Sequence, residues 1–142
     1  MENPETAEVL GRTHTALLTD LTKLKEIVQP GSGANLMQVS KQLAATDRHI
    51  TDHFGLEEQH GWIDVVRRQE PRWEHAIGQL VQEHRQLVKS LKTLIEEADA
   101  AQSLNLLLCE KILRWIERVI DHETRENELF EDAFVTDLGA GD

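Results

Sequence analysis

Two heptapeptides decide how this chain folds: DHFGLEE at residues 52–58 and DHETREN at residues 121–127. In each, a histidine stands four residues before a glutamate, which places both side chains on one face of an α-helix, one turn apart. The surrounding apolar residues continue that face, so both side chains are expected to point into the core. The pairs are His53 with Glu57 and His122 with Glu126. A core that contains two histidines and two carboxylates needs a chemical explanation, because buried charges are costly.

Helix signals run through the whole chain, whereas strand signals are nearly absent, and the sequence contains no Tyr. Two short connections and one of about ten residues predict an all-α fold, an antiparallel up-down-up-down four-helix bundle. We expect a single domain over residues 1–142, with 134–142 as a frayed tail. The predicted helices run from Asn3-Pro4 to about 29–33, from about 34 to 60, from Pro71 to about 98, and from about 103 to 133, with Gly61 ending the second and 62–70 a connection.

Each predicted helix has one apolar stripe in which spacings of three and four alternate, and polar residues interrupt all four stripes. In order, the stripes are Leu10, His14, Leu17, Leu21, Leu24, Val28; Leu36, Val39, Leu43, Thr46, Ile50, His53, Glu57, His60; Ile77, Leu80, His84, Leu87, Leu91, Leu94; and Leu108, Ile112, Trp115, Val119, His122, Glu126, Leu129.

The chain also contains an internal repeat. Leucines follow His14 and His84 at the same offsets of three, seven and ten residues. His53 follows His14 by 39 residues and His122 follows His84 by 38, and each second histidine has its glutamate four residues later. The sequence therefore reads as two copies of one helical hairpin, each with a histidine and then His-x-x-x-Glu.

The heights of these residues along the bundle can be counted from the hairpin turns. His14 precedes Gly31 by 17 residues and His84 precedes Ala101 by 17, which at about 1.5 Å per residue gives the same axial height. The two His/Glu pairs lie about as far from the turns once loop residues are discounted. All six side chains are therefore expected to meet in one layer, toward the end of the bundle that holds both chain termini.

Charge and composition restrict the possible partners. The chain has 15 Lys and Arg against 26 Asp and Glu, a net charge of −11, which repels nucleic acid and anionic lipid. The longest apolar run, 106–109, is far shorter than the roughly 20 residues that span a bilayer, and the acidic start is unlike a signal peptide. We expect a cytoplasmic protein without nucleic-acid or membrane partners. The only cysteine, Cys109, rules out an internal disulfide and a thiolate-based metal cluster.

The predicted layer lacks a cation from the chain itself. No Lys or Arg lies on the four stripes, and unpaired carboxylates in a helical core would each cost several kcal/mol. Four imidazoles and two carboxylates in one layer are ligands that suit a metal cluster. Two divalent ions would offset both glutamates and leave room for a bound hydroxide, whereas one ion would leave half of the ligands unused.

Four motifs give the chain a family likeness: RTHTALL, DHFGLEE, QEHRQL and DHETRENELF. In this order and at these separations they resemble the hemerythrin-like HHE cation-binding family, and the likeness covers nearly the whole chain. The resemblance implies a non-haem di-iron centre with an oxo or hydroxo bridge. By the same resemblance, the metal ligands are His14 with His53 on one iron, His84 with His122 on the other, and Glu57 with Glu126 bridging them.

The sequence departs from the oxygen carriers of that superfamily at two positions. The carriers have a second histidine one turn after the third-helix ligand, where this chain has Val88. They also end in His-x4-Asp, whereas the residue five after His122 is Asn127. The missing histidine is expected to leave open or water-filled positions on both irons. Binding, sensing or reaction with O2, peroxide or NO is therefore expected rather than reversible oxygen storage.

Other interpretations stay open at this stage. Manganese or zinc would accept the same ligands as iron, and the sequence does not decide whether the protein is an enzyme. It could be a metal-stabilised regulatory module that reports iron or oxygen to a protein partner without catalysis, or a metal-free helical adaptor. A zinc-protease site is disfavoured because HETRE at 122–126 lacks the second histidine of HExxH. A ferritin-like site is disfavoured because only one well-placed Glu-x-x-His, residues 57–60, is present.

The remaining histidines have simpler expected roles. His60 lies at a helix end and is expected to cap the helix or support a ligand. His49 is expected on a polar flank and His75 in solvent, and Cys109 is expected to pack against the core.

Overall fold

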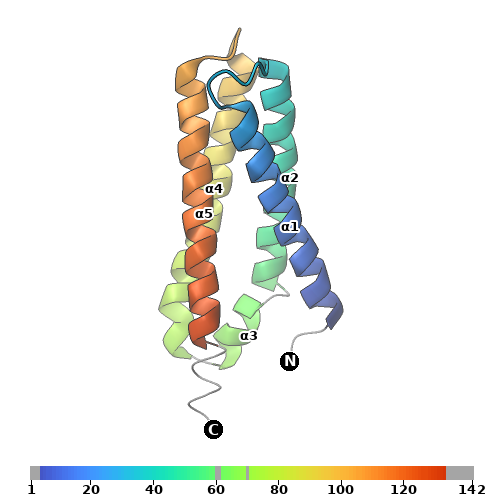
Figure 1. Ribbon diagram of the computed structural model, residues 1–142. Helices are drawn as coiled ribbons and strands as arrows, with labels where there is room; N and C mark the ends of the chain where they lie inside the picture. Colours follow the sequence, from blue (N-terminus) through green and yellow to red (C-terminus); the bar gives the residue numbers. More distant parts are fainter. Residues whose placement is uncertain (1–3, 60–61, 70, 134–142) are drawn as a thin grey trace.

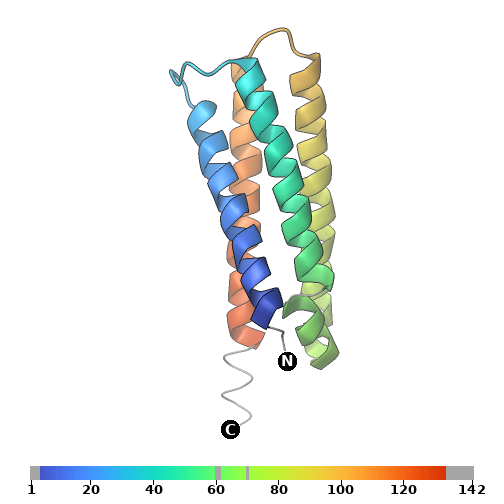
Figure 2. The same cartoon turned by 90° about the vertical axis from the view of Figure 1, so that its right-hand side faces the viewer.

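The computed structural model of this chain describes residues 4–59, 62–69 and 71–133. In this part of the chain every regular element is helical, which confirms the all-α prediction. Four long helices lie side by side and antiparallel (Figures 1 and 2), with α1 and α4 each in contact with α2 and α5 and lying diagonally across the bundle from one another. The elements are α1 (Pro4–Ile27), α2 (Leu36–Gln59), α3 (Trp62–Gln69), the 3-10 helix η1 (Pro71–Trp73), α4 (Glu74–Ala100) and α5 (Leu106–Glu131).

Local polar contacts fix where two of the long helices begin. At the start of α2, Asn35 and Gln38 form a capping box in which each side chain accepts a hydrogen bond from the other's backbone N–H, at 2.9 and 2.8 Å. At the start of α5, the Asn105 side chain accepts from the Leu108 N–H at 2.9 Å. Helix α5 therefore begins at Leu106, three residues later than the sequence predicted.

The predicted connection at 62–70 was wrong, because most of it is helical. Helix α3 spans Trp62–Gln69 and η1 follows it. Ile63 and Val66 lie three residues apart, so they share one helix face, and both are buried against Ile77 and Leu80 of α4. This packing stabilises a helix that is too short to be stable alone. The expectations for Asn3, His60, Gly61 and residues 134–142 fall outside the described residues.

A polar layer divides the hydrophobic core into two parts. The larger part lies toward the two hairpin turns, and the smaller part lies at the α3 end. Along α1, α4 and α5 the stripe passes from the larger part, through the layer, into the smaller part, whereas the last buried residue of α2 is Glu57 in the layer itself. The larger part contains Leu17, Leu21, Leu24, Val39, Leu43, Ile50, Leu87, Leu91, Ile112, Trp115 and Val119, and the smaller contains Ile63, Val66, Ile77, Leu80 and Ala133.

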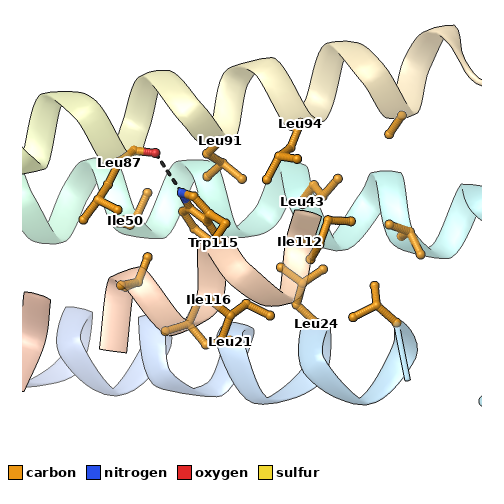
Figure 3. Close-up of a cluster of buried hydrophobic side chains, with 14 of the residues drawn as sticks. Leu21, Leu24, Leu43, Ile50, Leu87, Leu91, Leu94, Ile112, Trp115 and Ile116 are labelled. Atoms are coloured by element: carbon orange, nitrogen blue, oxygen red, sulfur yellow. Dashed lines mark hydrogen bonds between the residues drawn. The ribbon is translucent and has the colours of Figure 1, made fainter. Parts of the chain in front are cut away.

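Trp115 is the largest side chain of the fully buried core. Its ring packs among leucines and isoleucines of all four long helices (Figure 3). The indole N–H donates to the backbone carbonyl of Leu87 at 2.9 Å. This bond satisfies the one polar atom of the indole, and it ties α5 to α4 one turn above His84.

Candidate metal centre

The six side chains predicted from the sequence meet in the polar layer, and a seventh, Glu123, joins them. Each long helix contributes: His14 comes from α1, His53 and Glu57 from α2, His84 from α4, and His122, Glu123 and Glu126 from α5. His53, Glu57, His84, His122 and Glu126 are buried, whereas the His14 side chain is 42% exposed. The layer lies at the height that counting from the turns predicted.

One half of the cluster lies between α1, α2 and α5. Glu123 places Oε2 3.3 Å from Nδ1 of His14 and Oε1 3.6 Å from Nε2 of His53. The two imidazole rings are tilted by 44° to one another, with centroids 5.2 Å apart. One ligand atom from each of these three residues lies within 4.8 Å of the others, so the group could hold one cation.

The other half lies between α4 and α5. Glu126 places Oε1 2.9 Å from Nε2 of His122 and Oε2 3.6 Å from Nε2 of His84. The rings of His84 and His122 meet at an angle with centroids 4.7 Å apart. These three side chains are all buried and form a second group of possible ligands to one cation.

Glu57 lies between the two halves. Its Oε1 is 3.2 Å from Nε2 of His53 and 3.8 Å from Nε2 of His84. With Glu123 and Glu126 it forms a third group of carboxylates whose oxygens lie within 4.8 Å of one another. A carboxylate in this position is placed to bridge two cations.

The three buried histidines are oriented from outside the cluster. His53 Nδ1 lies 3.1 Å from the Thr13 hydroxyl, His84 Nδ1 lies 2.9 Å from Glu58 Oε2, and His122 Nδ1 lies 2.9 Å from Glu83 Oε1. In each ring Nε2 is left to face the cluster. A partner on one nitrogen fixes the ring and directs the lone pair of the other toward a metal.

The Glu83 carboxylate is itself held in place. Arg125 donates from both terminal guanidinium nitrogens to Glu83, at 2.7 and 2.6 Å, and from Nε to Asp121 at 3.0 Å. The Arg125 guanidinium, assisted by His122, lowers the pKa of Glu83 to about 2 despite partial burial. Glu83 is therefore ionised at neutral pH and can only accept a hydrogen bond from His122.

Unsatisfied buried atoms test whether these residues suit a metal. Among the described residues, the buried side-chain atoms without a hydrogen bond are concentrated in this layer. They include Nε2 of His53, His84 and His122, Oε1 of Glu57 and of Glu123, and both carboxylate oxygens of Glu126. Such atoms are expensive to bury unless something pairs with them. Imidazole nitrogens and carboxylate oxygens that converge without hydrogen bonds fit a metal cation.

The carboxylates of the layer differ in their pKa values. Burial, together with the neighbouring Glu126, raises the pKa of Glu57 well above its ordinary value. Burial acts in the same direction on Glu123, but the imidazoles of His14 and His53 outweigh it and lower the pKa to about 2. The pKa values of Glu57 and Glu123 are thus shifted in opposite directions within one layer.

The histidines differ as well. Burial lowers the pKa of His84. Burial also opposes the charged form of His122, but the carboxylates of Glu126 and Glu83 raise its pKa to about 9. The hydrogen bond with Glu123 raises the pKa of His14. Protons thus take up some of the positive charge that the layer needs, and a metal must displace them.

Phe54 forms an apolar wall beside the cluster. Its ring stacks on His84 with centroids 3.8 Å apart and planes 6° from parallel, and it meets the edge of His122 at 5.4 Å. Phe54 is buried. It excludes water from the side of the layer that faces the larger part of the core.

A cavity of about 580 Å³ opens onto the layer between α1 and α5. Figure 1 shows the two helices diverging toward the end where α1 begins and α5 ends. The apolar wall consists of Leu10, Gly11, Leu18, Ile120 and Phe130, and the polar surface of His14, His53, Glu57, Glu123, Thr124, Glu126 and Asn127. The His14 half of the cluster is therefore the accessible one.

The other residues singled out from the sequence are not among the possible metal ligands. His49 pairs with the buried Asp20 through Nδ1, on the flank between α1 and α2, and His75 is exposed, both as expected. Cys109 packs against the larger part of the core. Val88 is partly buried in the same part, and Asn127 is exposed and donates to Glu131 at 3.5 Å.

Glu123 was not predicted from the sequence because each predicted stripe was one residue wide. The buried face of α5 is broader, and a neighbouring row places Ile116 and Glu123 seven residues apart on the side of α1. A carboxylate in that row, next to a predicted ligand, was the available signal. Glu58 and Glu83 were also missed, because a residue that only supports a ligand leaves no spacing pattern of its own.

A comparison with known protein families identifies the family of this chain. None of the described helices is long and apolar enough to cross a membrane. No curated protein and no solved structure matches the chain. The model of one family, described as the hemerythrin HHE cation binding domain, matches residues 6–133. This match covers most of the chain and includes all seven cluster residues, so the protein is a member of the hemerythrin HHE cation-binding family.

Proposed function

We propose that this protein binds two non-haem iron ions in the polar layer and that the centre binds, senses or reacts with O2, peroxide or NO in the cytoplasm. The observation that supports this most is the convergence of buried atoms that lack hydrogen bonds, three imidazole Nε2 and several carboxylate oxygens, from α2, α4 and α5. A polar network evolved for structure alone would satisfy those atoms with hydrogen bonds.

The geometry suggests which residues would hold each metal. His14 and His53 would hold one, His84 and His122 would hold the other, and Glu57 lies between the two pairs. Glu126 contacts both histidines of the second pair, and we propose it as the other carboxylate shared by the centre. When bound, the irons would supply one-electron oxidation and reduction and positions for a small ligand.

The chain's own residues prepare this chemistry. Thr13, Glu58 and Glu83 hold the three buried rings through Nδ1, so little reorganisation is needed when a metal binds. Phe54 keeps water away from His84 and His122. A dry, preformed pocket limits side reactions of a redox centre.

The cavity between α1 and α5 supports a small ligand as the partner. It opens on His14 and Glu57, and its apolar wall suits an uncharged diatomic molecule or peroxide. Val88 at the position where oxygen carriers have a fifth histidine leaves the other half with fewer imidazoles. This difference favours reaction or sensing over reversible storage of O2.

Metal content is the direct test. Protein produced with iron supplied should contain about two irons per chain by elemental analysis, with near-ultraviolet charge-transfer absorption. Stopped-flow mixing with peroxide, O2 and NO then identifies the ligand. Absence of stoichiometric metal under both reducing and oxidising conditions would overturn the proposal, and two zinc or manganese ions would correct the metal.

One observation favours a second function, a metal-stabilised regulatory module. The polar layer interrupts the stripe of every long helix, so the stability of the bundle should depend on the metal. Such a module would report iron or oxygen to a protein partner without catalysis. A large metal-dependent gain in melting temperature with no turnover of peroxide would favour this function.

A further inference from the structure

The Glu123 carboxylate lies inside the cluster but outside the ligand pattern of the repeat. Its two oxygens are 3.3 Å from Nδ1 of His14 and 3.6 Å from Nε2 of His53, and its side chain is 12% exposed. Oε1 is buried without a hydrogen bond. Both ion pairs found for Glu123 within the described part of the chain are with histidines.

The internal repeat shows that this carboxylate belongs to one half only. Glu123 directly follows His122, and the matching position after His53 is Phe54. Phe54 stacks on His84 and has no ligand atom, whereas Glu123 reaches back to the α1 and α2 histidines. The two halves of the chain therefore supply different side chains at equivalent positions.

The charge of the layer also changes when Glu123 is counted. Glu57, Glu123 and Glu126 have oxygens within 4.8 Å of one another. Three carboxylates this close repel one another strongly in a site of low dielectric. Two divalent cations would offset all three carboxylates and leave the layer close to neutral.

We propose that Glu123 is a further metal ligand, bound to the metal of His14 and His53 on the side that opens into the cavity. The inference rests on the proposed di-iron site. That metal would then have two imidazoles and one carboxylate from this group of residues. The carboxylate would lie on the cavity side, where an incoming ligand would approach. A small ligand must therefore compete with Glu123, so anions that bind iron weakly are disfavoured.

Azide is the probe, because it binds ferric iron and produces a visible charge-transfer band. The experiment uses the full iron-loaded chain in its oxidised form and compares Glu123→Ala and Glu123→Gln with the wild type. Glu128→Ala is the matched control, since Glu128 is an exposed glutamate of the same helix. Iron per chain, azide dissociation constant and the oxygen and nitrogen shell by X-ray absorption are measured.

If Glu123 is a ligand, the Glu123→Ala variant should bind azide at least about tenfold more tightly than the wild type, because azide no longer competes with the carboxylate for the metal. A tenfold change in the dissociation constant corresponds to about 1.4 kcal/mol. The absorption bands should shift, while Glu128→Ala matches the wild type. Loss of one iron per chain in Glu123→Ala with the other retained also supports the inference. Glu123→Gln keeps the shape of the side chain, so it tests the ligand role even if the alanine variant does not fold.

Two outcomes overturn the inference in distinguishable ways. If the wild type holds two irons and both Glu123 variants match it in iron content, azide affinity and spectrum, Glu123 is not a ligand and the proposed function survives. If the wild type holds no stoichiometric metal, the proposed function and this inference fail together.

Discussion

Glu83 Oε1 lies 2.9 Å from Nδ1 of His122, and this contact turns Nε2 of the buried ring into the cluster. Because Arg125 keeps Glu83 ionised, the carboxylate can only accept, so a ring that binds a metal through Nε2 keeps its proton on Nδ1. Glu83→Ala should therefore weaken metal binding by about 10- to 100-fold. Competition with a chelator measures the affinity. Glu117→Ala, which removes an exposed glutamate from the same surface, is the control and should leave the affinity unchanged.

The repeat predicts that the two halves each hold one metal. His14→Ala and His84→Ala should each remove about one of the two metal ions, because each deletes an imidazole from a different pair. Elemental analysis of the purified variants measures the loss. His75→Ala removes an exposed histidine of α4 and should retain both ions. If one variant loses all metal and the other none, the assignment of the pairs is wrong.

Metal removal should destabilise the protein. A ligand present at about 1,000 times its dissociation constant adds about 4 kcal/mol to the free energy of unfolding, which for a chain of this size raises the melting temperature by about 10 °C. Thermal unfolding with and without a chelator measures the difference.

The double variant His53→Ala, Glu57→Ala is the control for the stability measurement. It should lose the metal-dependent gain, because it removes one imidazole and the central carboxylate. A metal-free adaptor would behave differently: its wild type would not respond to the chelator, and the double variant would be equally stable or more stable.

Metal binding should release protons and strengthen as pH rises. The pKa of His122 is raised from 6.5 to about 9 in the folded chain, so the folded side chain holds a proton that the unfolded chain has lost. This contribution to metal-free stability is fully present below about pH 6.5 and disappears as pH rises through about 9. A metal at pH 7 must displace the proton, so affinity increases toward pH 9.

Calorimetry in buffers with different ionisation enthalpies counts the released protons. The expected result at pH 7 is net release on metal addition, from His122, whose pKa is raised to about 9. Binding without proton release would show that the metal does not use this side chain.

The cavity gives a prediction for access. A Cβ added at Gly11 meets no atom within 4 Å, so Gly11→Phe should extend into the cavity without displacing the helix. Binding of NO or azide should become slower while the metal content stays at the wild-type value. Gly78→Phe is the matched control, because Gly78 is an equally open helical glycine that lies away from the cavity. Equal rates in both variants would exclude this route.

The long helices could be predicted because their stripes are long and regular, and the layer could be predicted because helical rise is constant. His53 and Glu57 were found by the same spacing that buries Ile50. Helix α3 was missed because Ile63 and Val66 are too few to show a period, and their burial depends on α4. Glu123 was missed because it lies in a second row of α5, and its contacts with His14 of α1 and His53 of α2 depend on how the three helices pack.

The polar layer also determines how the bundle comes apart. It separates a large hydrophobic part from a small one formed by α3 and the adjoining helix ends. Without a cation, the carboxylates at the boundary repel one another and decouple the small part, so its backbone amides should exchange with solvent by opening locally. With the layer filled, both parts should exchange only by global unfolding. Whether metal fills the buried layer would thereby decide how accessible α3 is. A protease or a binding partner could respond to that change.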